Sequence, residues 1–229
     1  MHPVFLELNR PFPSPNHALE DPNGLLAIGA DLSPQRLIAA YDNGIFPWFS
    51  DDQPVLWWSP NPRIGLDLSA HNVNKSMQKF IRRTTLKVTV NNDFPQVIER
   101  CAALRTDETW INQEMIKAYI ALHQLERAHS VEVWNGEELV GGLYGVLVGE
   151  VFCGESMFHT ETNASKLAFH RFCQHFKQHG GVYIDGQVEN PHLLSLGMEA
   201  IERECFLNLL NKHKNNKVDA KCWQQQVIF

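Results

Sequence analysis

The sequence lacks any run of about 18 uninterrupted apolar residues, the length needed to span a bilayer. It also lacks an N-terminal basic region followed by a long apolar segment, so we expect no secretory signal. Its five cysteines are widely spaced and form no CxxC pair, which argues against a disulfide framework and against a zinc ribbon. We therefore expect a cytoplasmic protein with reduced thiols and no membrane partner.

The signatures of several enzyme classes are missing as well. The chain has no GxSxG nucleophile elbow, no P-loop, no GxGxxG after a strand and no HExxH pair. Along the sequence, its eleven histidines show none of the spacings typical of metal ligands. We accordingly expect neither a metal nor another cofactor.

The formal net charge of −6 argues against a protein whose whole surface binds nucleic acid. One segment is basic nevertheless. On a helix, Lys75, Lys79 and Arg82 share one face at spacings of four and seven, and Arg83 follows directly. This face is either a solvated charged surface or a contact for phosphate groups, and both readings stay open.

Residues 1–30 are rich in Pro, Asn and Gly, which predicts loops and turns. Further on, the hydrophobic patterns predict helices at 33–44, 75–83, 93–104, 112–125 and 163–179. They predict strands at 86–90, 130–134, 139–147, 151–158 and 182–188. We expect the polar tail after residue 213 to be frayed, unless Trp223 and residues 227–229 dock back.

This order of elements predicts the α+β class, with a small loop-rich N-terminal domain at 1–70 and a catalytic domain at 71–229. The boundary is expected within 70–95. Aromatic rings and prolines gather at 46–63, where most rings should build the small domain's core and at least one could line a pocket. Arg63 lies close to Trp58 in sequence and is expected to form a surface ion pair or to contact a phosphate.

Two short stretches carry groups suited to acyl transfer. Asp185 and Gln187 stand two apart on a predicted strand, so both side chains should leave the same face. A carboxylate beside an amide can orient and deprotonate an attacking amine. Glu155 lies between Gly154 and Ser156 at an expected bend, where one acidic group would attract a cationic substrate. Ordinary structural hydrogen bonds are the alternative role for all three.

A series of motifs in order resembles one family across nearly the whole chain. The motifs are GIFPW at 44–48, WWSPNPR at 57–63, ETWI at 108–111, AHSVEVW at 128–134, LVGGLYG at 139–145, GESMF at 154–158, NASK at 163–166, DGQV at 185–188 and HLLSLG at 192–197. Together they resemble bacterial leucyl/phenylalanyl-tRNA–protein transferases. Gly186, Glu108 and Met198 depart from the residues usual in that family, although none of them is a proposed reacting group.

The resemblance implies a GNAT-like C-terminal acyltransferase domain that uses aminoacyl-tRNA in place of acetyl-CoA. It implies transfer of Leu or Phe, and less well Met, from leucyl-tRNA or phenylalanyl-tRNA to proteins with N-terminal Arg or Lys, which marks them for degradation by the N-degron route. Asp185 and Gln187 are then catalytic, and Glu155 receives the basic acceptor. The implied aminoacyl pocket comprises Tyr41, Trp48, Trp110, Tyr119, Leu143, Phe152 and Phe172.

Phosphate contacts to tRNA are expected from the basic residues Arg63, Lys75, Lys79, Arg82 and Arg83. We expect a monomer. Two alternatives remain, an acetyl-CoA-dependent acetyltransferase of the same fold and a tRNA-binding adaptor without transfer activity. The first needs a glycine-rich loop before the helix at 163–179, where the chain instead reads His-Thr-Glu-Thr-Asn at 159–163. The second predicts tRNA binding without transfer.

Overall fold

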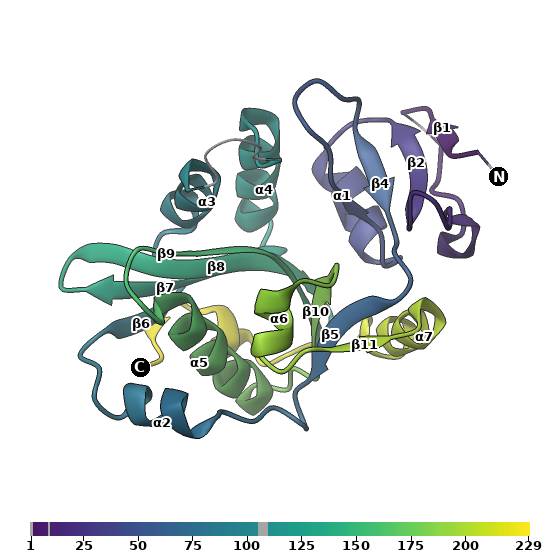
Figure 1. Cartoon of the computed structure of the whole chain (residues 1–229). Coiled ribbons are helices and arrows are strands. Elements are labelled where there is room, and N and C mark those ends of the chain that lie inside the picture. The colour runs from purple at the N-terminus through teal and green to yellow at the C-terminus, as the bar shows by residue number, and fades with distance from the viewer. Residues whose placement is uncertain (1, 9, 105–109) are drawn as a thin grey trace.

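The computed structural model describes residues 2–8, 10–104 and 110–229, and it contains two β-sheets flanked by helices (Figure 1). The smaller sheet has the strand order β1-β2-β4-β3. The larger sheet has the order β11-β5-β10-β9-β8-β7-β6-β12. The predicted α+β class, with a small N-terminal part and a larger C-terminal part, is confirmed.

The N-terminal part is more regular than its composition predicts. It consists of the strands β1 (Val4–Leu6), β2 (Leu25–Gly29), β3 (Phe46–Pro47) and β4 (Leu56–Trp58), with the helix α1 (Pro34–Tyr41) and a 3-10 turn (Pro15–His17). Residues 25–29, expected as loop, pair with β4 and bury their apolar side chains. Helix α1 starts as predicted, because the Ser33 side chain accepts a hydrogen bond from the Arg36 amide and proline fills the first helical position.

The larger sheet is built around a long antiparallel hairpin. Its strands are β5 (Arg63–Asp67), β6 (Lys87–Val90), β7 (Ala128–Asn135), β8 (Glu138–Val148), β9 (Val151–His159), β10 (Tyr183–Gln187), β11 (Glu199–Ile201) and β12 (Gln226–Val227). Strands β9 and β10 pair in parallel, and helix α5 (Ala164–Gln178) makes the crossover between them. The hairpin and the crossover agree with the sequence pattern.

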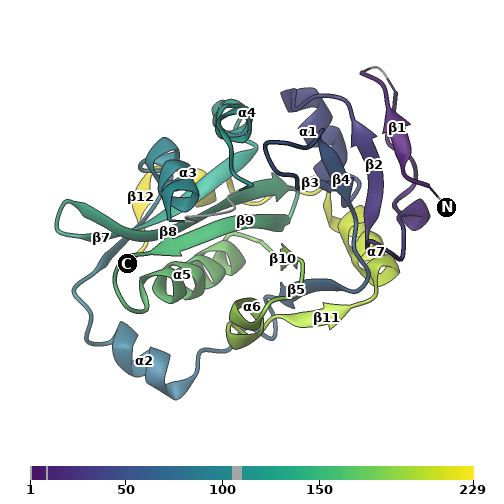
Figure 2. The same cartoon turned by 45° about the horizontal axis from the view of Figure 1, so that its top comes forward.

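Helices cover both faces of this sheet. Helices α3 (Phe94–Ala103) and α4 (Gln113–Gln124) lie on one face, α5 lies on the other, and α2 (Lys75–Ile81) projects beyond it (Figures 1 and 2). The short α6 (Pro191–Ser195) and α7 (Arg203–His213) lie towards the β5 and β11 edge (Figure 2). One apolar cluster joins Trp57 and Tyr41 of the N-terminal part to Tyr119 and Tyr144, so the two parts share a core.

The chain leaves the small sheet after β4 and enters the large sheet at β5, between residues 58 and 63. This crossing lies earlier than the expected boundary of residue 70, because residues 63–67 pair with β10 and β11 instead of with the small sheet. We propose the domain boundary at this crossing.

The C-terminal tail is not frayed, contrary to expectation. Strand β12 pairs with β6, and the 3-10 turn Ala220–Trp223 brings the indole of Trp223 onto the ring of His129 at a centroid distance of 3.9 Å. The guanidinium of Arg171 lies 3.6 Å from the ring centroid of Phe229. The alternative, that the last residues dock back, is confirmed, and the tail covers one face of the large sheet's core.

Arg63 is buried, which corrects its expected place at the surface. Its side chain is 1% exposed, and its Nε and Nη2 donate to the two carboxylate oxygens of Asp185 at 2.8 and 2.7 Å. Nη1 donates to the Gly44 carbonyl oxygen at 3.1 Å, and the rings of Phe46 and Phe206 flank the guanidinium. These acceptors and rings enclose the charge, so Arg63 cannot contact a phosphate in this structure.

Breaking this pair from one side should destabilise the fold. Arg63→Met leaves the Asp185 carboxylate buried without its partner, so we expect the free energy of unfolding to fall by about 3–5 kcal/mol. Urea denaturation measures the loss. The matched control is Asp42→Asn, which breaks the half-exposed pair of Asp42 with Arg127 and should cost about 1 kcal/mol or less. Equal losses in the two variants would contradict the structural role of Arg63.

Candidate functional site

A cavity of about 960 Å³ opens where strands β9 and β10 separate. The two strands pair over only three positions, from Tyr183 beside Val151 to Asp185 beside Cys153. Beyond these pairs, the cavity is lined by residues 154–157 of β9 and by residues 186–190, which begin at the end of β10 and run past it. The N-terminal part closes it with Phe46, Trp48 and Trp58. The site therefore depends on both sheets.

A β-bulge in each strand directs the polar side chains of the site. Between β8 and β9 the register shifts so that Tyr144 pairs with Ser156 and Gly145 with Gly154, which leaves Glu155 as the extra residue. The expected bend at Glu155 is therefore a bulge within a continuous strand. A second shift separates Asp185 from Gln187, whose φ is 64°. The simple same-face alternation expected for Asp185 and Gln187 does not describe this bulged strand.

Glu155 is the centre of a buried hydrogen-bond network. Its Oε1 accepts from the Tyr41 hydroxyl at 2.7 Å and from Gln187 Nε2 at 2.6 Å, and its Oε2 accepts from the Tyr119 hydroxyl at 3.0 Å. The two tyrosine hydroxyls also contact each other closely. The side chain of Glu155 is 9% exposed and lines the cavity. An acid that faces the cavity is thus held by three neutral partners.

The number of protons in this network favours the neutral form of Glu155. Three oxygen–oxygen contacts join the carboxyl group and the two hydroxyls, but an ionised carboxylate leaves only the two hydroxyl protons to occupy them. A protonated carboxyl supplies the third. Burial raises the pKa of Glu155 to about 7, although the bonds from Tyr41, Tyr119 and Gln187 act in the opposite direction. Glu155 therefore changes its charge near neutral pH.

Asp185 is fully buried and has its oxygen atoms engaged. Besides the two bonds from Arg63, its Oδ1 accepts from the Gln187 backbone amide at 2.9 Å. Burial is the largest single influence on Arg63 and disfavours its charged form, but the charge and hydrogen bonds of Asp185, with smaller contributions from Cys153 and Tyr41, together raise its pKa. This arrangement suits the part of the expectation in which Asp185 holds Gln187 and so helps to orient the amine, more than the part in which it removes a proton. The carboxylate fixes the backbone at Gln187.

The apolar residues expected at the site fall into two groups. Trp48, Trp110, Leu143, Phe152 and Phe172 line the cavity. Tyr41 and Tyr119 do not belong to its lining; they are almost wholly buried and reach the site through Glu155. Of the predicted ETWI motif, Glu108 and Thr109 lie outside the described residues.

Sequence reasoning missed part of the lining. Tyr144, Met157, His192, Leu193 and Met198 border the cavity, and no motif marked them as a set. Two of the three residues that depart from the family's usual pattern, Gly186 and Met198, lie side by side here. A Cβ atom on Gly186 would lie 2.6 Å from the sulfur of Met198. The methionine thus occupies space that a side chain at position 186 would need. Two such distant positions can be linked only once the fold is known.

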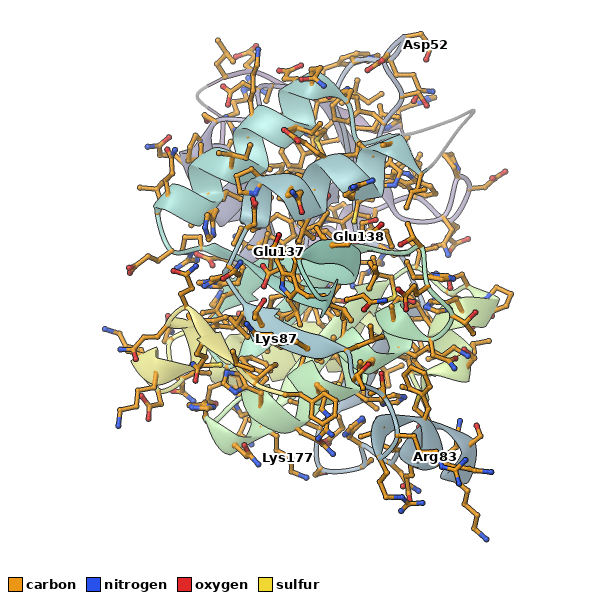
Figure 3. The ribbon with its side chains drawn as sticks, turned by 90° about the vertical axis from the view of Figure 1, so that its left-hand side faces the viewer. Asp52, Arg83, Lys87, Glu137, Glu138 and Lys177 are labelled. Atoms are coloured by element: carbon orange, nitrogen blue, oxygen red, sulfur yellow. The ribbon has the colours of Figure 1, made fainter. Side chains whose placement is uncertain are left out.

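The basic helix α2 lies apart from this cavity. Lys75, Lys79, Arg82 and Arg83 are exposed, whereas Met77 faces the core, as the amphipathic pattern predicts. Figure 3 shows Arg83 on the protruding helix, at the opposite end of the molecule from Asp52.

Among the described helices, none is long and apolar enough to cross a membrane.

Two family models match this chain, one in each of its two parts. The family model described as leucyl/phenylalanyl-tRNA protein transferase matches residues 66–211, and the model of its N-terminal domain matches residues 30–61. The chain is similar to the "Leucyl/phenylalanyl-tRNA--protein transferase" of Psychromonas ingrahamii, with 51% identity over 96% of this chain and 94% of that protein. The protein of the same description from Pectobacterium carotovorum is 55% identical over 95% of this chain and 93% of its own length.

Solved structures are more distant. The structure titled "L-PGS from Bacillus licheniformis" has 13% identity and a TM-score of 0.40, and the match covers 72% of this chain and 53% of that one. The sequence matches are decisive by themselves, since they extend over nearly the full length of both proteins. The chain belongs to the leucyl/phenylalanyl-tRNA–protein transferase family.

Proposed function

We propose that this protein, as a cytoplasmic monomer, transfers Leu or Phe, and less well Met, from aminoacyl-tRNA to proteins with N-terminal Arg or Lys. The modified proteins would enter the N-degron route. Its family identifies it as an aminoacyltransferase that moves Leu or Phe from tRNA to protein. The observation that carries the finer proposal is the buried acid Glu155 in the wall of an aromatic cavity.

The apolar part of the cavity suits the donor's side chain. Phe152 and Phe172 pack against each other at a centroid distance of 4.6 Å and border the cavity together with Leu143. Burying a Leu or Phe side chain against such a wall stabilises the complex by about 1.5–3 kcal/mol. A charged side chain would lose its hydration there without gaining a partner, which excludes charged aminoacyl groups. The wall therefore favours the donors that we propose.

Glu155 suits the acceptor's basic side chain. In the empty site its carboxyl group is close to half ionised at neutral pH. A guanidinium or ammonium group nearby would stabilise the carboxylate and draw the equilibrium to the ionised form. A neutral N-terminal residue would offer no such compensation for the buried charge. This difference provides the proposed selection of Arg and Lys.

Gln187 is the group that we propose to orient the attacking amine. Its Nε2 is held by Glu155 and its backbone amide by Asp185, so the carbonyl Oε1 is positioned to accept an amine N–H. An amide cannot remove the proton, but an α-amine has a pKa of about 7.7–8.0 and is partly neutral already. The amine nitrogen attacks the ester carbonyl carbon, the new C–N bond forms, and the C–O bond to the tRNA ribose breaks. The amine proton ends on the ribose oxygen.

The acceptor rule provides the main test of the function. We expect labelled leucine to pass from leucyl-tRNA to a peptide beginning with Arg and not to its matched copy beginning with Ala. Incorporation into each peptide is measured by filter binding and mass spectrometry. Transfer to both peptides would refute the acceptor selection. Binding of tRNA without any transfer would favour an adaptor, and turnover of acetyl-CoA would favour an acetyltransferase.

The pH dependence tests the role of Glu155. Both its ionised form and the neutral amine are needed, so kcat/KM for an Arg peptide should rise about a hundredfold per pH unit well below pH 7. Glu155→Gln removes one of these two ionisations, and the rise should fall to about tenfold per unit. Loss of the charged contact should also lower kcat/KM above pH 8 by about 2 kcal/mol, or ~30-fold. An unchanged slope in the variant would contradict this role.

The basic helix is the proposed contact for tRNA phosphates. Lys75→Ala with Lys79→Ala should weaken tRNA binding and reduce the slope of log K against log salt concentration by about 1.5. Lys117→Ala is the matched control, because Lys117 is equally exposed but lies on α4, on the other side of the molecule (Figure 1). Fluorescence anisotropy of labelled tRNA measures both quantities. Equal slopes in the wild type and the double variant would place the tRNA elsewhere.

A further inference from the structure

Two histidines and a cysteine converge behind the pocket wall, outside the site described above. His175 and His179 stand one turn apart near the end of α5, and Cys222 of the C-terminal tail faces them. One ligand atom of each residue lies within 4.8 Å of those of the other two. No spacing typical of metal ligands was expected among the histidines. His175 and His179 are nevertheless four residues apart, and the third member of the cluster, Cys222, is remote from them in sequence.

The hydrogen bonds of the cluster keep both rings in a form that can bind a metal. His175 Nε2 donates to the Cys222 carbonyl oxygen at 2.8 Å, and His179 Nδ1 donates to the His175 carbonyl oxygen at 2.8 Å. A neutral imidazole that donates through one nitrogen keeps a lone pair on the other. Such bonds to backbone carbonyls also orient the histidine ligands of known metal sites.

We propose that His175, His179 and Cys222 form a site for a zinc ion. Two imidazole nitrogens and one thiolate are a ligand set that suits Zn²⁺, with water as the fourth ligand. Bonds of about 2.0–2.3 Å require the ligand atoms to approach one another by about 1 Å from their present spacing. His179 is partly exposed at the end of α5, which gives the ion a route from solvent. Binding releases the Cys222 proton to solvent as the S–Zn bond forms.

The ion would fasten the tail to the catalytic part of the protein. Trp223 follows Cys222 directly, and its indole lies 5.8 Å from the ring centroids of both Phe152 and Phe172. Those two rings line the substrate cavity. A zinc ion at Cys222 therefore stabilises the outer layer of the cavity wall without taking part in the transfer reaction. The site is structural and independent of the proposed function.

The test uses untagged, full-length protein, stripped with a chelator and kept reduced. Titration with zinc chloride should show one equivalent bound by calorimetry, and the ion should raise the melting temperature. Cobalt(II) should give the near-ultraviolet charge-transfer band of a cobalt–thiolate bond. His179→Ala and Cys222→Ser should each weaken zinc binding at least tenfold, and Cys222→Ser should abolish the band. Cys205→Ser is the matched control, because Cys205 is exposed and lies outside the cluster.

Three results would overturn the proposal: no stoichiometric binding to the wild type, undiminished affinity in His179→Ala, or a cobalt–thiolate band that survives Cys222→Ser. His179→Ala keeps the test decisive even if the buried Cys222→Ser variant fails to fold, because His179 lies at the end of α5 and is only partly buried. The circular dichroism spectrum of each variant verifies folding before titration.

Discussion

The buried pair of Arg63 and Asp185 is the interaction on which the site depends. Arg63 is the first residue of the large sheet, yet its guanidinium also binds the carbonyl of Gly44 and lies over Phe46 of the N-terminal part. The backbone amide of Gln187 donates a hydrogen bond to Asp185, and the side chain of Gln187 donates one to Glu155. These bonds fix the three residues relative to one another. Because charges buried without partners are strongly unfavourable, this chain of contacts has few alternative arrangements. It holds two parts of the protein and the reactive side chains in one geometry.

Around this rigid centre, the site combines two requirements that normally oppose each other. An aromatic wall needs an environment without water, whereas a cation needs a charged partner. Glu155 meets both requirements, because its pKa of about 7 makes the neutral and the ionised form accessible near neutral pH, and the proposed cationic acceptor would favour the ionised one. The hydroxyls of Tyr41 and Tyr119 hold either form of the carboxyl group in place.

Much of this architecture could be predicted from the sequence, and the exceptions share a physical cause. The helices and the β8–β9 hairpin follow from local periodicity, which depends on near neighbours. The burial of Arg63, the coverage by the tail and the strand β2 depend on partners far away in the chain, which no local pattern reveals. The bulges belong to this second class, since a register shift exists only between paired strands. Motif resemblance predicted Tyr41 and Tyr119 as pocket residues but could not assign them to a layer behind Glu155.

The bulge at Glu155 also bears on attempts to make the protein more robust. Cys153 and Phe158 belong to the same apolar cluster although they are an odd number of residues apart, which regular alternation does not permit. A strand shorter by one residue would restore regular pairing and keep both ends in the core. Packing alone therefore does not require the extra residue. Thermostability screens that reward regular strands would thus select against the bulge that places Glu155 in the cavity wall.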